Sequence, residues 1–222
     1  MSVLVVKCGG ARAADAAAEI RELVRPGERV VVVHGAGPQI SRAMAERGLP
    51  VEFVGGRRVT TADGLAVVRE ELAAVNRALA SALGPRAVGL FGDVVGLKAT
   101  PVPELGLVGD ALPSRPPAVA AAVAASLVPV VAPLAVGPLN VNADDAAAAI
   151  ALGLEAERLV FLSDVPGVYH EGDVVGSLGV EEARGLVAAG AFEGGIVPKL
   201  LAAARAAAGG VDATIGATAV VA

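Results

Sequence analysis

A lysine and two glycines follow an apolar run near the beginning of the sequence, in the stretch VVKCGGARA at residues 5–13. A lysine at the end of a buried strand is costly unless an anion neutralises its charge. The glycines Gly9 and Gly10 would let the backbone approach that anion closely. The stretch therefore predicts an anion site that combines the ammonium group of Lys7 with backbone N–H groups.

Three other stretches place glycines or polar residues where apolar runs end or helical segments begin. Residues 34–38 (HGAGP) follow RVVVV, residues 163–167 (SDVPG) follow RLVFL, and residues 140–144 (NVNAD) precede a helical segment. In an open sheet of parallel strands, ligands bind at the carboxyl ends of the strands. Glycines between a strand and a helix let N–H groups hold a phosphate or a carboxylate. Two such turns on neighbouring strands would hold two anions side by side.

Each of these features also has a structural alternative. Glycine-rich turns can serve only to close the chain tightly, and Asp144 can act as a helix cap. Cys8 is expected to be a small buried hydrophobic residue, and His34 stands without the serine and carboxylate partners of a catalytic triad. The sequence contains neither a G-x-x-x-x-G-K-[ST] phosphate loop nor a G-x-G-x-x-G turn after a strand. It has no cluster of histidines and cysteines for a structural zinc ion.

Lys199 lies in the first turn of another helical segment, within the stretch EGGIVPKLL at residues 193–201. A lysine there opposes the helix dipole, so the simplest alternative is an exposed surface residue. Lysine is scarce in this chain, however. Lys7, Lys98 and Lys199 are the only three, and arginine supplies the other fifteen of the 18 basic residues. Where arginine is the usual cation, a lysine indicates a role that needs a compact ammonium group.

These residues need elements that bring several turns to one edge of a sheet. Apolar, β-branched runs at 2–6, 29–33, 127–132 and 158–162 indicate strands buried on both faces, as in a parallel sheet. Alanine-rich helical segments alternate with them, at residues 12–25, 38–48, 62–83, 144–154, 179–189 and 196–208. The alternation predicts an α/β fold, a three-layer αβα sandwich with a mostly parallel central sheet. The stretch 99–117 is expected to leave this sheet as a hairpin.

The overall composition limits the class of protein. The chain has 222 residues, of which 55% are hydrophobic, and its net charge is −5. No cluster of lysine and arginine is present, which argues against nucleic acid as a partner. The single cysteine rules out an intrachain disulfide and fits a reducing compartment, so a cytoplasmic location without a signal peptide is expected. Three prolines interrupt the longest uncharged stretch, 116–139, so a short helix and a buried strand are expected there, and no membrane span.

Six motifs, in this order, resemble the amino acid kinase family. They are Lys7-x-Gly9-Gly10, His34-Gly35-x-Gly37-Pro38, Gly56-x-Arg58-Val59-Thr60, Asn140-x-Asn142-Ala143-Asp144, Ser163-Asp164-Val165-x-Gly167-Val168 and Gly194-Gly195-x-x-x-Lys199. The resemblance covers residues 3–211. It implies one continuous domain with two lobes, in which residues 1–155 bind an acyl amino acid and mediate dimerisation and residues 156–222 bind ATP. It also implies ATP-dependent phosphorylation of the side-chain carboxylate of N-acetyl-L-glutamate, a step of arginine biosynthesis.

Two alternatives to this function stay open. The substrate could be a carrier-protein-linked aminoadipate or glutamate, as in related kinases of lysine biosynthesis, although the acidic chain argues mildly against an acidic carrier. The chain could also be a non-catalytic sensor with the same fold. The joint presence of Lys7, Asp144 and Lys199 argues against a sensor.

The resemblance further assigns roles to individual residues. The catalytic residues would be Lys7, Lys199 and Asp144, with the carboxylate holding the two ammonium groups in place and not acting as a base. Gly9 and Gly10 would bind phosphate, while Mg²⁺ would bind through the ATP phosphates and not at a protein metal site. The acyl amino acid would be bound by Gly35, Ala36, Arg58 and Asn140, with a bidentate contact from Arg58 to its α-carboxylate. The residues that border the nucleotide would be Asp164, Val165, Gly167, Val168, Tyr169, Phe192 and Glu193.

The sequence departs from the family pattern at three places. Ala36 stands where the family has a glycine, which would cost about 1 kcal/mol if that position needed a positive φ. Residues 89–97 lack the usual form with lysine and glycine. A helix is missing after Gly210, so residues 214–221 are expected to finish the sheet. The resemblance also implies a homodimer paired through the helix at 62–83 and, because the first strand begins at once, no inhibition by arginine.

Overall fold

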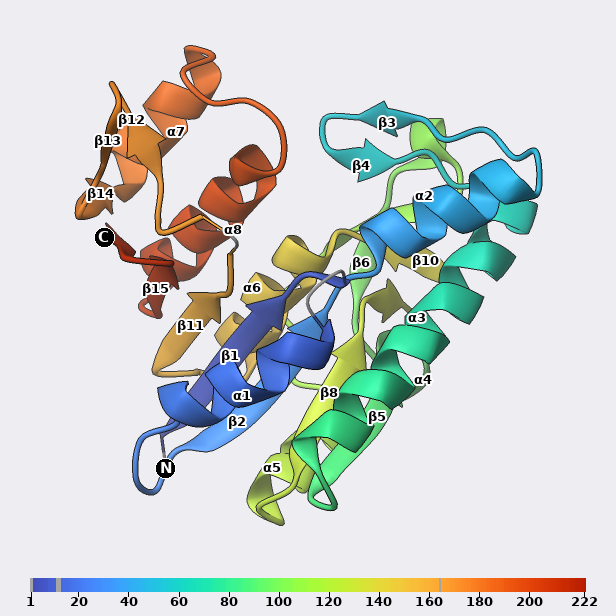
Figure 1. Ribbon diagram of the computed structural model, residues 1–222, viewed down its shortest axis with the longest axis horizontal. Coiled ribbons are helices and arrows are strands. Elements are labelled where there is room, and N and C mark those ends of the chain that lie inside the picture. The colour runs from blue at the N-terminus through green and yellow to red at the C-terminus, as the bar shows by residue number, and fades with distance from the viewer. Residues whose placement is uncertain (1, 11–12, 164) are drawn as a thin grey trace.

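Eight strands form the central sheet of the computed structural model, which describes residues 2–10, 13–163 and 165–222 (Figure 1). In spatial order they are β14 (Ser177–Gly179), β16 (Thr218–Val221), β15 (Asp212–Ile215), β11 (Arg158–Phe161), β1 (Val3–Cys8), β2 (Arg29–His34), β8 (Val128–Ala132) and β5 (Ala87–Phe91). The six strands from β15 to β5 run parallel, whereas β16 is antiparallel to β15 and parallel to β14. The prediction of a mostly parallel central sheet is confirmed.

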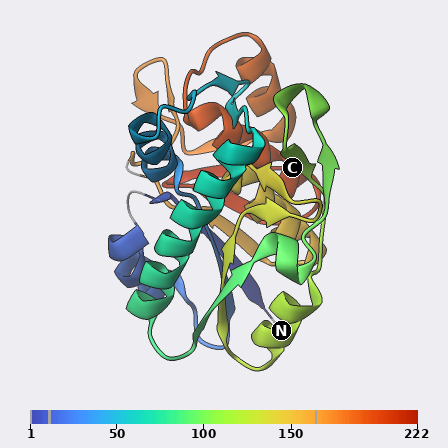
Figure 2. The same ribbon diagram turned by 90° about the vertical axis from the view of Figure 1, so that its right-hand side faces the viewer.

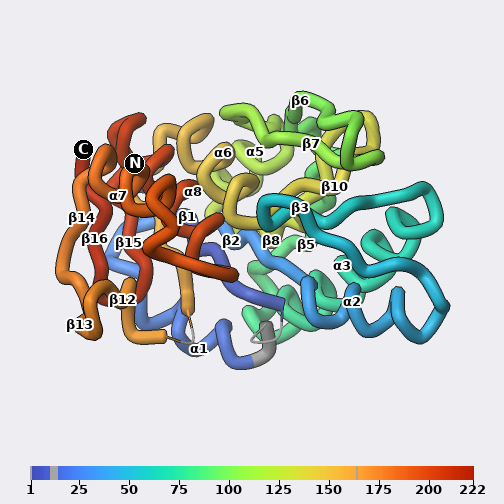
Figure 3. Tube along the Cα trace, turned by 90° about the horizontal axis from the view of Figure 1, so that it is seen from above, coloured from blue at the N-terminus to red at the C-terminus, as the bar shows by residue number. Residues whose placement is uncertain are grey.

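Helices cover both faces of this sheet and make three layers. Along β1, Leu4 and Val6 belong to one buried cluster and Val3 and Val5 to the other, because successive side chains of a strand point to opposite faces. The first face is covered by α1 (Ala13–Leu23), α2 (Gly37–Glu46) and α3 (Ala62–Leu83), and the second by α5 (Pro117–Ala124), α6 (Ala143–Gly153) and α8 (Ile196–Ala208). Figure 3 shows α1 and α2 on one side of the strands and α5 and α6 on the other.

The alanine-rich composition of two helices is explained by their packing. Residues 146–149 and Ala151 of α6 are fully buried, as are most alanines of α8, which packs against it. Small side chains let two helix backbones approach closely while the interior stays close-packed. On the outer side of α8 lies α7 (Val180–Ala188). Within the part of the chain that the structure describes, no helix is both long and apolar enough to cross a membrane.

A second, smaller sheet stands beside the carboxyl ends of the main strands. Its order is β6 (Ala99–Pro101), β7 (Val108–Ala111), β10 (Leu139–Val141) and β9 (Leu134–Ala135). The antiparallel pair β6–β7 encloses the 3₁₀ helix η2 (Pro103–Leu105), so the hairpin predicted within 99–117 is confirmed. Its association with β10 and β9 was not predicted. The remaining elements are the hairpins β3 (Phe53–Val54)–β4 (Arg57–Arg58) and β12 (Tyr169–His170)–β13 (Asp173–Val174), and the short helix α4 (Gly92–Val95).

The carboxyl-terminal segment adds the last two strands of the chain to the central sheet, and no helix lies between or after them in residues 212–222. Strands β15 and β16 pair antiparallel and are joined by Gly216 and Ala217, with Gly216 at φ +55°. The expectation that this segment finishes the sheet is confirmed. Residues up to 155 supply β1, β2, β8 and β5, and later residues supply β11, β15, β16 and β14. The assignment of the two lobes to acyl amino acid and ATP stays a prediction.

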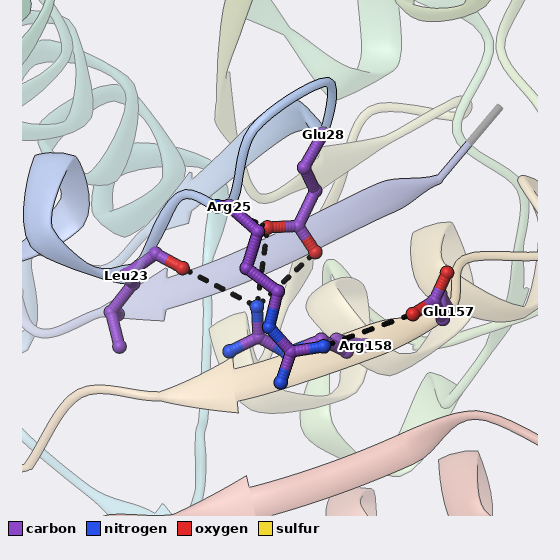
Figure 4. A network of polar contacts seen from close by, with 5 residues as sticks. All are labelled: Leu23, Arg25, Glu28, Glu157 and Arg158. Atoms are coloured by element: carbon purple, nitrogen blue, oxygen red, sulfur yellow. Dashed lines mark hydrogen bonds and ion pairs between the residues drawn. The ribbon is translucent and has the colours of Figure 1, made fainter.

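A network of ion pairs connects the amino ends of the parallel strands (Figure 4). The Nη1 atom of Arg158, at the start of β11, lies 3.2 Å from both carboxylate oxygens of Glu28 and donates to the Leu23 carbonyl at 3.3 Å. Glu28 also accepts from the backbone N–H of Arg25 at 2.9 Å. The Arg25 side chain reaches Glu157 at 3.9 Å. These contacts join the loop between α1 and β2 to β11 at the edge opposite the glycine-rich turns.

Candidate active site

A cavity of about 450 Å³ opens at the carboxyl ends of β1 and β2. The turns after these two strands, the β3–β4 hairpin, β10 and the amino ends of α6 and α8 surround it. Its lining includes nine of the predicted site residues: Lys7, Gly9, Gly10, Gly35, Ala36, Arg58, Asn140, Asp144 and Lys199. It also includes polar residues without a predicted role, Arg57 and Asn142. The fold therefore brings together residues that are up to 192 positions apart in the sequence, the separation of Lys7 and Lys199.

Lys7 and Asp144 form a buried ion pair at the base of this cavity. The Lys7 Nζ atom lies 2.7 Å from Asp144 Oδ1, and both side chains are only 7% exposed. Removing one partner of such a pair would leave an uncompensated charge in a poorly solvated place. The contact fixes the ammonium group at the end of β1, where a bound anion would meet it.

Asn142, and not Asp144, caps helix α6. The Asn142 side-chain oxygen accepts from the backbone N–H of Asp144 at 2.7 Å and from that of Asp145 at 3.4 Å. The capping alternative for Asp144 is therefore wrong, because its carboxylate faces Lys7. An asparagine two residues before an acidic pair is a recognisable cap signal, and it could have been assigned from the sequence.

The two glycine-rich turns touch each other. A Cβ atom on Gly10 would lie 2.5 Å from the carbonyl oxygen of Gly35 and from Cα of Ala36, so only glycine fits there. The Gly35 N–H donates to the Cys8 carbonyl at 3.0 Å, and the Gln39 side-chain amide donates to the Gly10 carbonyl at 2.9 Å. Gln39 was not predicted to take part. Its hydrogen bond fixes the turn that carries Gly9 and Gly10 against the start of α2.

Ala36 occupies its turn without backbone strain. Its φ is −146° and its ψ is 27°, so the position does not need the left-handed conformation that favours glycine. The expectation of a cost there depended on a positive φ and does not apply. Cys8 is fully buried, as expected for a small hydrophobic residue, and burial raises the pKa of its thiol to about 12.

Arg58 is a buried cation without a carboxylate partner among the residues that the structure describes. The residue is 6% exposed, and its Nη2 atom donates to Ser41 Oγ at 2.7 Å and to the Gly37 carbonyl at 3.2 Å. Its guanidinium carbon lies 4.5 Å from the centre of the Phe53 ring. Burial lowers the pKa of Arg58, yet arginine stays charged in proteins. These neutral contacts orient the group and leave its charge available to a ligand.

The hairpin that carries Arg58 also reaches across the cavity. Gly55 and Gly56 form its two-residue turn with φ values of +55° and +77°, which the primed hairpin turns require. A Cβ atom on Gly56 would lie 3.7 Å from Pro198, next to Lys199 in α8. Arg57 pairs with Asp110 of β7 at 2.7 Å. The hairpin therefore contacts both sides of the cavity, and Arg57, which has no predicted role, helps to hold it.

Asn140 is oriented by a chain of hydrogen bonds behind Arg58. Its side-chain N–H donates to Thr60 Oγ1 at 3.0 Å, and Thr60 Oγ1 donates to the Arg58 carbonyl at 2.8 Å. Because one amide N–H points to Thr60, the amide oxygen and the second N–H of Asn140 are left to face a ligand. Thr60 is fully buried. Its two hydrogen bonds explain why the motif has a threonine after Arg58 and Val59.

Lys199 enters the cavity from α8. Its Nζ atom donates to the Gly195 carbonyl at 3.1 Å, one turn earlier in the same helix, and both residues line the cavity. The contact of Asp144 with Lys7 is present. The predicted contact of Asp144 with Lys199 stays a prediction.

The described residues among those predicted to border the nucleotide lie outside the lining of this cavity. Val168 is fully buried in the core. Its N–H donates to Thr218 Oγ1 at 2.8 Å and its carbonyl accepts from the Val175 N–H at 2.9 Å, so both of its backbone groups are already paired. A Cβ atom on Gly167 would lie 2.7 Å from that same hydroxyl oxygen, which gives this glycine a packing role. The other five are the exposed Val165, Tyr169 and Glu193, the buried Phe192, and Asp164, which lies outside the described residues. Their contact with a nucleotide stays a prediction.

The site therefore combines cations, backbone donors and one carboxylate that is already paired. No group of three or more His, Cys, Asp or Glu that could hold a metal ion is found in residues 2–10, 13–163 and 165–222. His34 is buried, and burial lowers its pKa to about 4, so it stays neutral near pH 7. Such an arrangement can bind and position two anions, and it offers no evident general base.

The chain belongs to the amino acid kinase family, whose model matches residues 2–216. It is 43% identical over 224 residues to the acetylglutamate kinase of Rubrobacter xylanophilus, covering 97% of this chain and 88% of that protein. It is 41% identical over 243 residues to the acetylglutamate kinase of Kineococcus radiotolerans, covering 95% and 81%. Among solved structures, that of smu.665 from Streptococcus mutans UA159 has a TM-score of 0.88 at 26% identity, and the match covers 99% of this chain and 98% of that one.

Proposed function

We propose that this chain is an acetylglutamate kinase, which transfers the terminal phosphoryl group of Mg²⁺-bound ATP to the side-chain carboxylate of N-acetyl-L-glutamate. This reaction makes an acyl phosphate for arginine biosynthesis. The observation that carries the proposal is the buried guanidinium of Arg58, which no described carboxylate neutralises. An amino acid derivative brings an α-carboxylate that fits this group. The names of relatives that are 43% and 41% identical support the same substrate.

The chemistry needs positioning and positive charge more than it needs a base. The nucleophile is a carboxylate oxygen that is already ionised at neutral pH. It forms a bond to the terminal phosphorus while the bond from phosphorus to the bridging oxygen breaks, and ADP leaves with that electron pair. Lys7 stabilises the charge on the transferring group, and Asp144 keeps its ammonium in place. Gly9 has nothing within 4 Å of a Cβ position, which gives the transferring group room beside it.

The acyl amino acid would lie between the second glycine-rich turn and the β3–β4 hairpin. Arg58 takes the α-carboxylate through two parallel N–H donors. The free amide oxygen of Asn140 accepts from the acetamido N–H. Backbone groups of Gly35 and Ala36 complete the contact, and the side-chain carboxylate then points to Lys7.

The nucleotide would enter from the side of α8. Lys199 and the amino end of this helix face its phosphates, where the helix dipole favours negative charge. Mg²⁺ arrives as part of the nucleotide substrate, bound through the phosphates. The adenosine would lie along Val165, Gly167, Val168, Tyr169, Phe192 and Glu193, with the Tyr169 ring, 49% exposed, as the largest available apolar surface.

The test is ATP-dependent trapping of the acyl phosphate with hydroxylamine, using N-acetylglutamate, glutamate, aspartate and carbamate as acceptors. We expect a hydroxamate from N-acetylglutamate and ADP formation at the same rate. A preparation that makes no product from N-acetylglutamate but turns over aspartate or carbamate would contradict the proposal. The exposed Lys98, which does not line the cavity, provides a matched control as Lys98→Ala.

The assembly would be a homodimer paired through α3 and the neighbouring edge of the sheet. Strand β5 is the last strand of the sheet, so one side of it has no strand partner there. Figure 2 shows α3 running along the side turned to the viewer. An open edge with a long helix beside it is a surface that a second copy would cover. Sedimentation velocity measures the mass directly, and a monomer at micromolar concentration would contradict this assembly.

A further inference from the structure

Two buried polar side chains, His34 and Asn76, lie behind the predicted substrate turn and have no part in the proposed chemistry. His34 is the last residue of β2 and is fully buried, and Asn76 in α3 is 3% exposed. Asn76 Nδ2 lies 3.0 Å from His34 Nε2 and donates to the Val130 carbonyl at 2.9 Å. Buried polar groups are retained only where they are paired, so this arrangement has to satisfy each of them.

The orientation of the Asn76 amide is fixed by its surroundings. A backbone carbonyl only accepts, so the nitrogen of the amide must face Val130. The amide oxygen lies on the opposite side, against Gly89 of β5. A Cβ atom on Gly89 would be 2.1 Å from that oxygen, so this glycine makes room for the amide. With two N–H groups and one of them on Val130, Asn76 donates the other to His34 Nε2.

The tautomer of His34 follows from that contact. If Nε2 accepts a hydrogen bond, a neutral imidazole carries its proton on Nδ1. The Nδ1 atom lies 3.4 Å from the carbonyl oxygen of Gly35. On the neighbouring strand, Cys8 lies opposite His34 in register, and its thiol is buried and neutral. Lys7, one residue earlier, points to the other face of the sheet and pairs with Asp144 of α6. The imidazole is therefore surrounded by neutral groups and presents an N–H to the Gly35 carbonyl.

We propose that Asn76 sets the tautomer of His34 so that its Nδ1–H fixes the Gly35–Ala36 peptide of the substrate turn. In a trans peptide the C=O and the N–H point in opposite directions, so fixing the Gly35 carbonyl also fixes the Ala36 N–H. That N–H is a donor assigned to the acyl amino acid. His34 and Asn76 act through the turn and are positioning residues. Their link to substrate affinity rests on the proposed function.

Two substitutions of His34 separate positioning from simple filling of space. In His34→Asn the side-chain amide occupies the place of Nδ1, so it can donate to the Gly35 carbonyl. In His34→Gln the amide reaches the place of Nε2, so it keeps the contact with Asn76 and loses the contact with Gly35. Glutamine fills more of the buried volume than asparagine. If His34 only fills space, His34→Gln should keep KM for N-acetylglutamate closer to that of the unchanged protein. If His34 positions the turn, His34→Asn should do so.

We expect His34→Gln to raise KM for N-acetylglutamate about tenfold, because a buried carbonyl loses its donor. His34→Asn should stay within about threefold of the unchanged protein by the same reasoning. KM for ATP should change little in both, and thermal unfolding of both variants reports the cost of packing separately. Equal KM values in the two variants, or a lower KM in His34→Gln, would overturn the proposal.

The tautomer itself is measured in the unchanged protein by ¹⁵N NMR of the imidazole nitrogens. The chain has two histidines, so the signal that is absent from His34→Asn, or the one that remains in His170→Asn, belongs to His34. We expect the Nδ1–H form and no titration between pH 5 and pH 8. An Nε2–H form, or titration near the usual value of about 6.5, would contradict the inference. This measurement needs no substrate, so it stays decisive if the variants do not fold or if the proposed function fails.

Discussion

Two buried arginines stand at opposite ends of the parallel strands and have opposite surroundings. Arg158, at the amino end of β11, has a side chain that is 14% exposed and pairs with Glu28, whose side chain is 2% exposed (Figure 4). Arg58, beside the carboxyl ends, is 6% exposed, and among the described residues it contacts Ser41, a backbone carbonyl, Met44 and the Phe53 ring, with no carboxylate. One cation is neutralised within the chain. The other is oriented by neutral groups and keeps its charge for a ligand.

A related difference distinguishes the two edges of the sheet, although the carboxyl-end edge also holds the ion pair of Lys7 and Asp144. At the amino ends, cations and carboxylates meet each other, and the loops are ordinary connections. At the carboxyl ends, glycine-rich turns expose backbone donors, and Arg58 lies on the cavity wall with Lys199. A buried ion pair contributes to structure, whereas a buried cation without a counter-charge indicates where an anion binds. The charge of Arg58, which no described carboxylate neutralises, therefore indicates the site independently of the relatives.

The largest effect on catalysis is expected from removing the lysines of the site. Lys7→Ala and Lys199→Ala should each lower kcat roughly 10²-fold or more, as is typical when a preorganised charge is deleted. The affinity for ATP should weaken by a smaller factor. Steady-state kinetics with the hydroxamate assay measures both quantities.

Lys98→Ala is the matched control for these two variants. Its side chain is exposed and does not line the cavity, so kcat should be nearly unchanged. A loss in Lys98→Ala as large as that in the other two would mean that the assignment of the lysines is wrong.

A smaller effect is expected from Arg58→Lys, which keeps the charge but loses the planar fork. One ammonium group cannot reproduce a bidentate carboxylate contact or the bonds to Ser41 and Gly37. KM for N-acetylglutamate should rise about tenfold, while KM for ATP stays within about twofold. Equal changes in the two KM values would indicate that Arg58 is structural and that the comparison with Arg158 fails.

Breaking the ion pair at the amino ends should change stability and leave turnover as it is. Glu28→Ala leaves Arg158 buried without its carboxylate, which is expected to cost about 3 kcal/mol of unfolding free energy. Urea unfolding measures this cost, and kcat is measured well below the unfolding temperature. Glu157→Ala removes an exposed pair and should cost less than about 1 kcal/mol. A fall in kcat of folded Glu28→Ala would mean that the two edges are coupled.

The last prediction concerns a change in stability with pH at Asp145, which follows Asp144 in α6. Burial raises its pKa from the ordinary value of 3.8 to about 6, with Arg57 partly opposing the shift. The folded protein therefore binds this proton more tightly than the unfolded chain, so its contribution to stability is lost as pH rises from about 4 to above 6. Asp145→Asn should raise the unfolding free energy by about 1–3 kcal/mol at pH 8 and leave it unchanged at pH 4. The same difference at both pH values would contradict this assignment.

Many of the helices and strands could be predicted from the sequence, because hydrophobic patterns are strong where both faces of an element are buried. The runs at 29–33 and 127–132 became β2 and β8, and the segment at 62–83 became α3 with the same bounds. The two lysines and the glycine-rich turns follow from residue type and position, and Arg58 follows from the resemblance to the amino acid kinase family. Strand β5 was missed because its five residues contain a glycine and lie at the edge of the sheet.

Only the tertiary structure decided which of these residues meet and which have another role. Periodicity cannot say that Asp144 faces Lys7, that Gln39 bonds Gly10, or that Arg57 reaches Asp110. These contacts join positions far apart in the chain, and they depend on the register and orientation of packed elements. The sequence determined the elements and the chemical groups, since both follow from local side-chain properties. The tertiary structure decided their partners, because a partner is fixed by distance and burial, which no single segment contains.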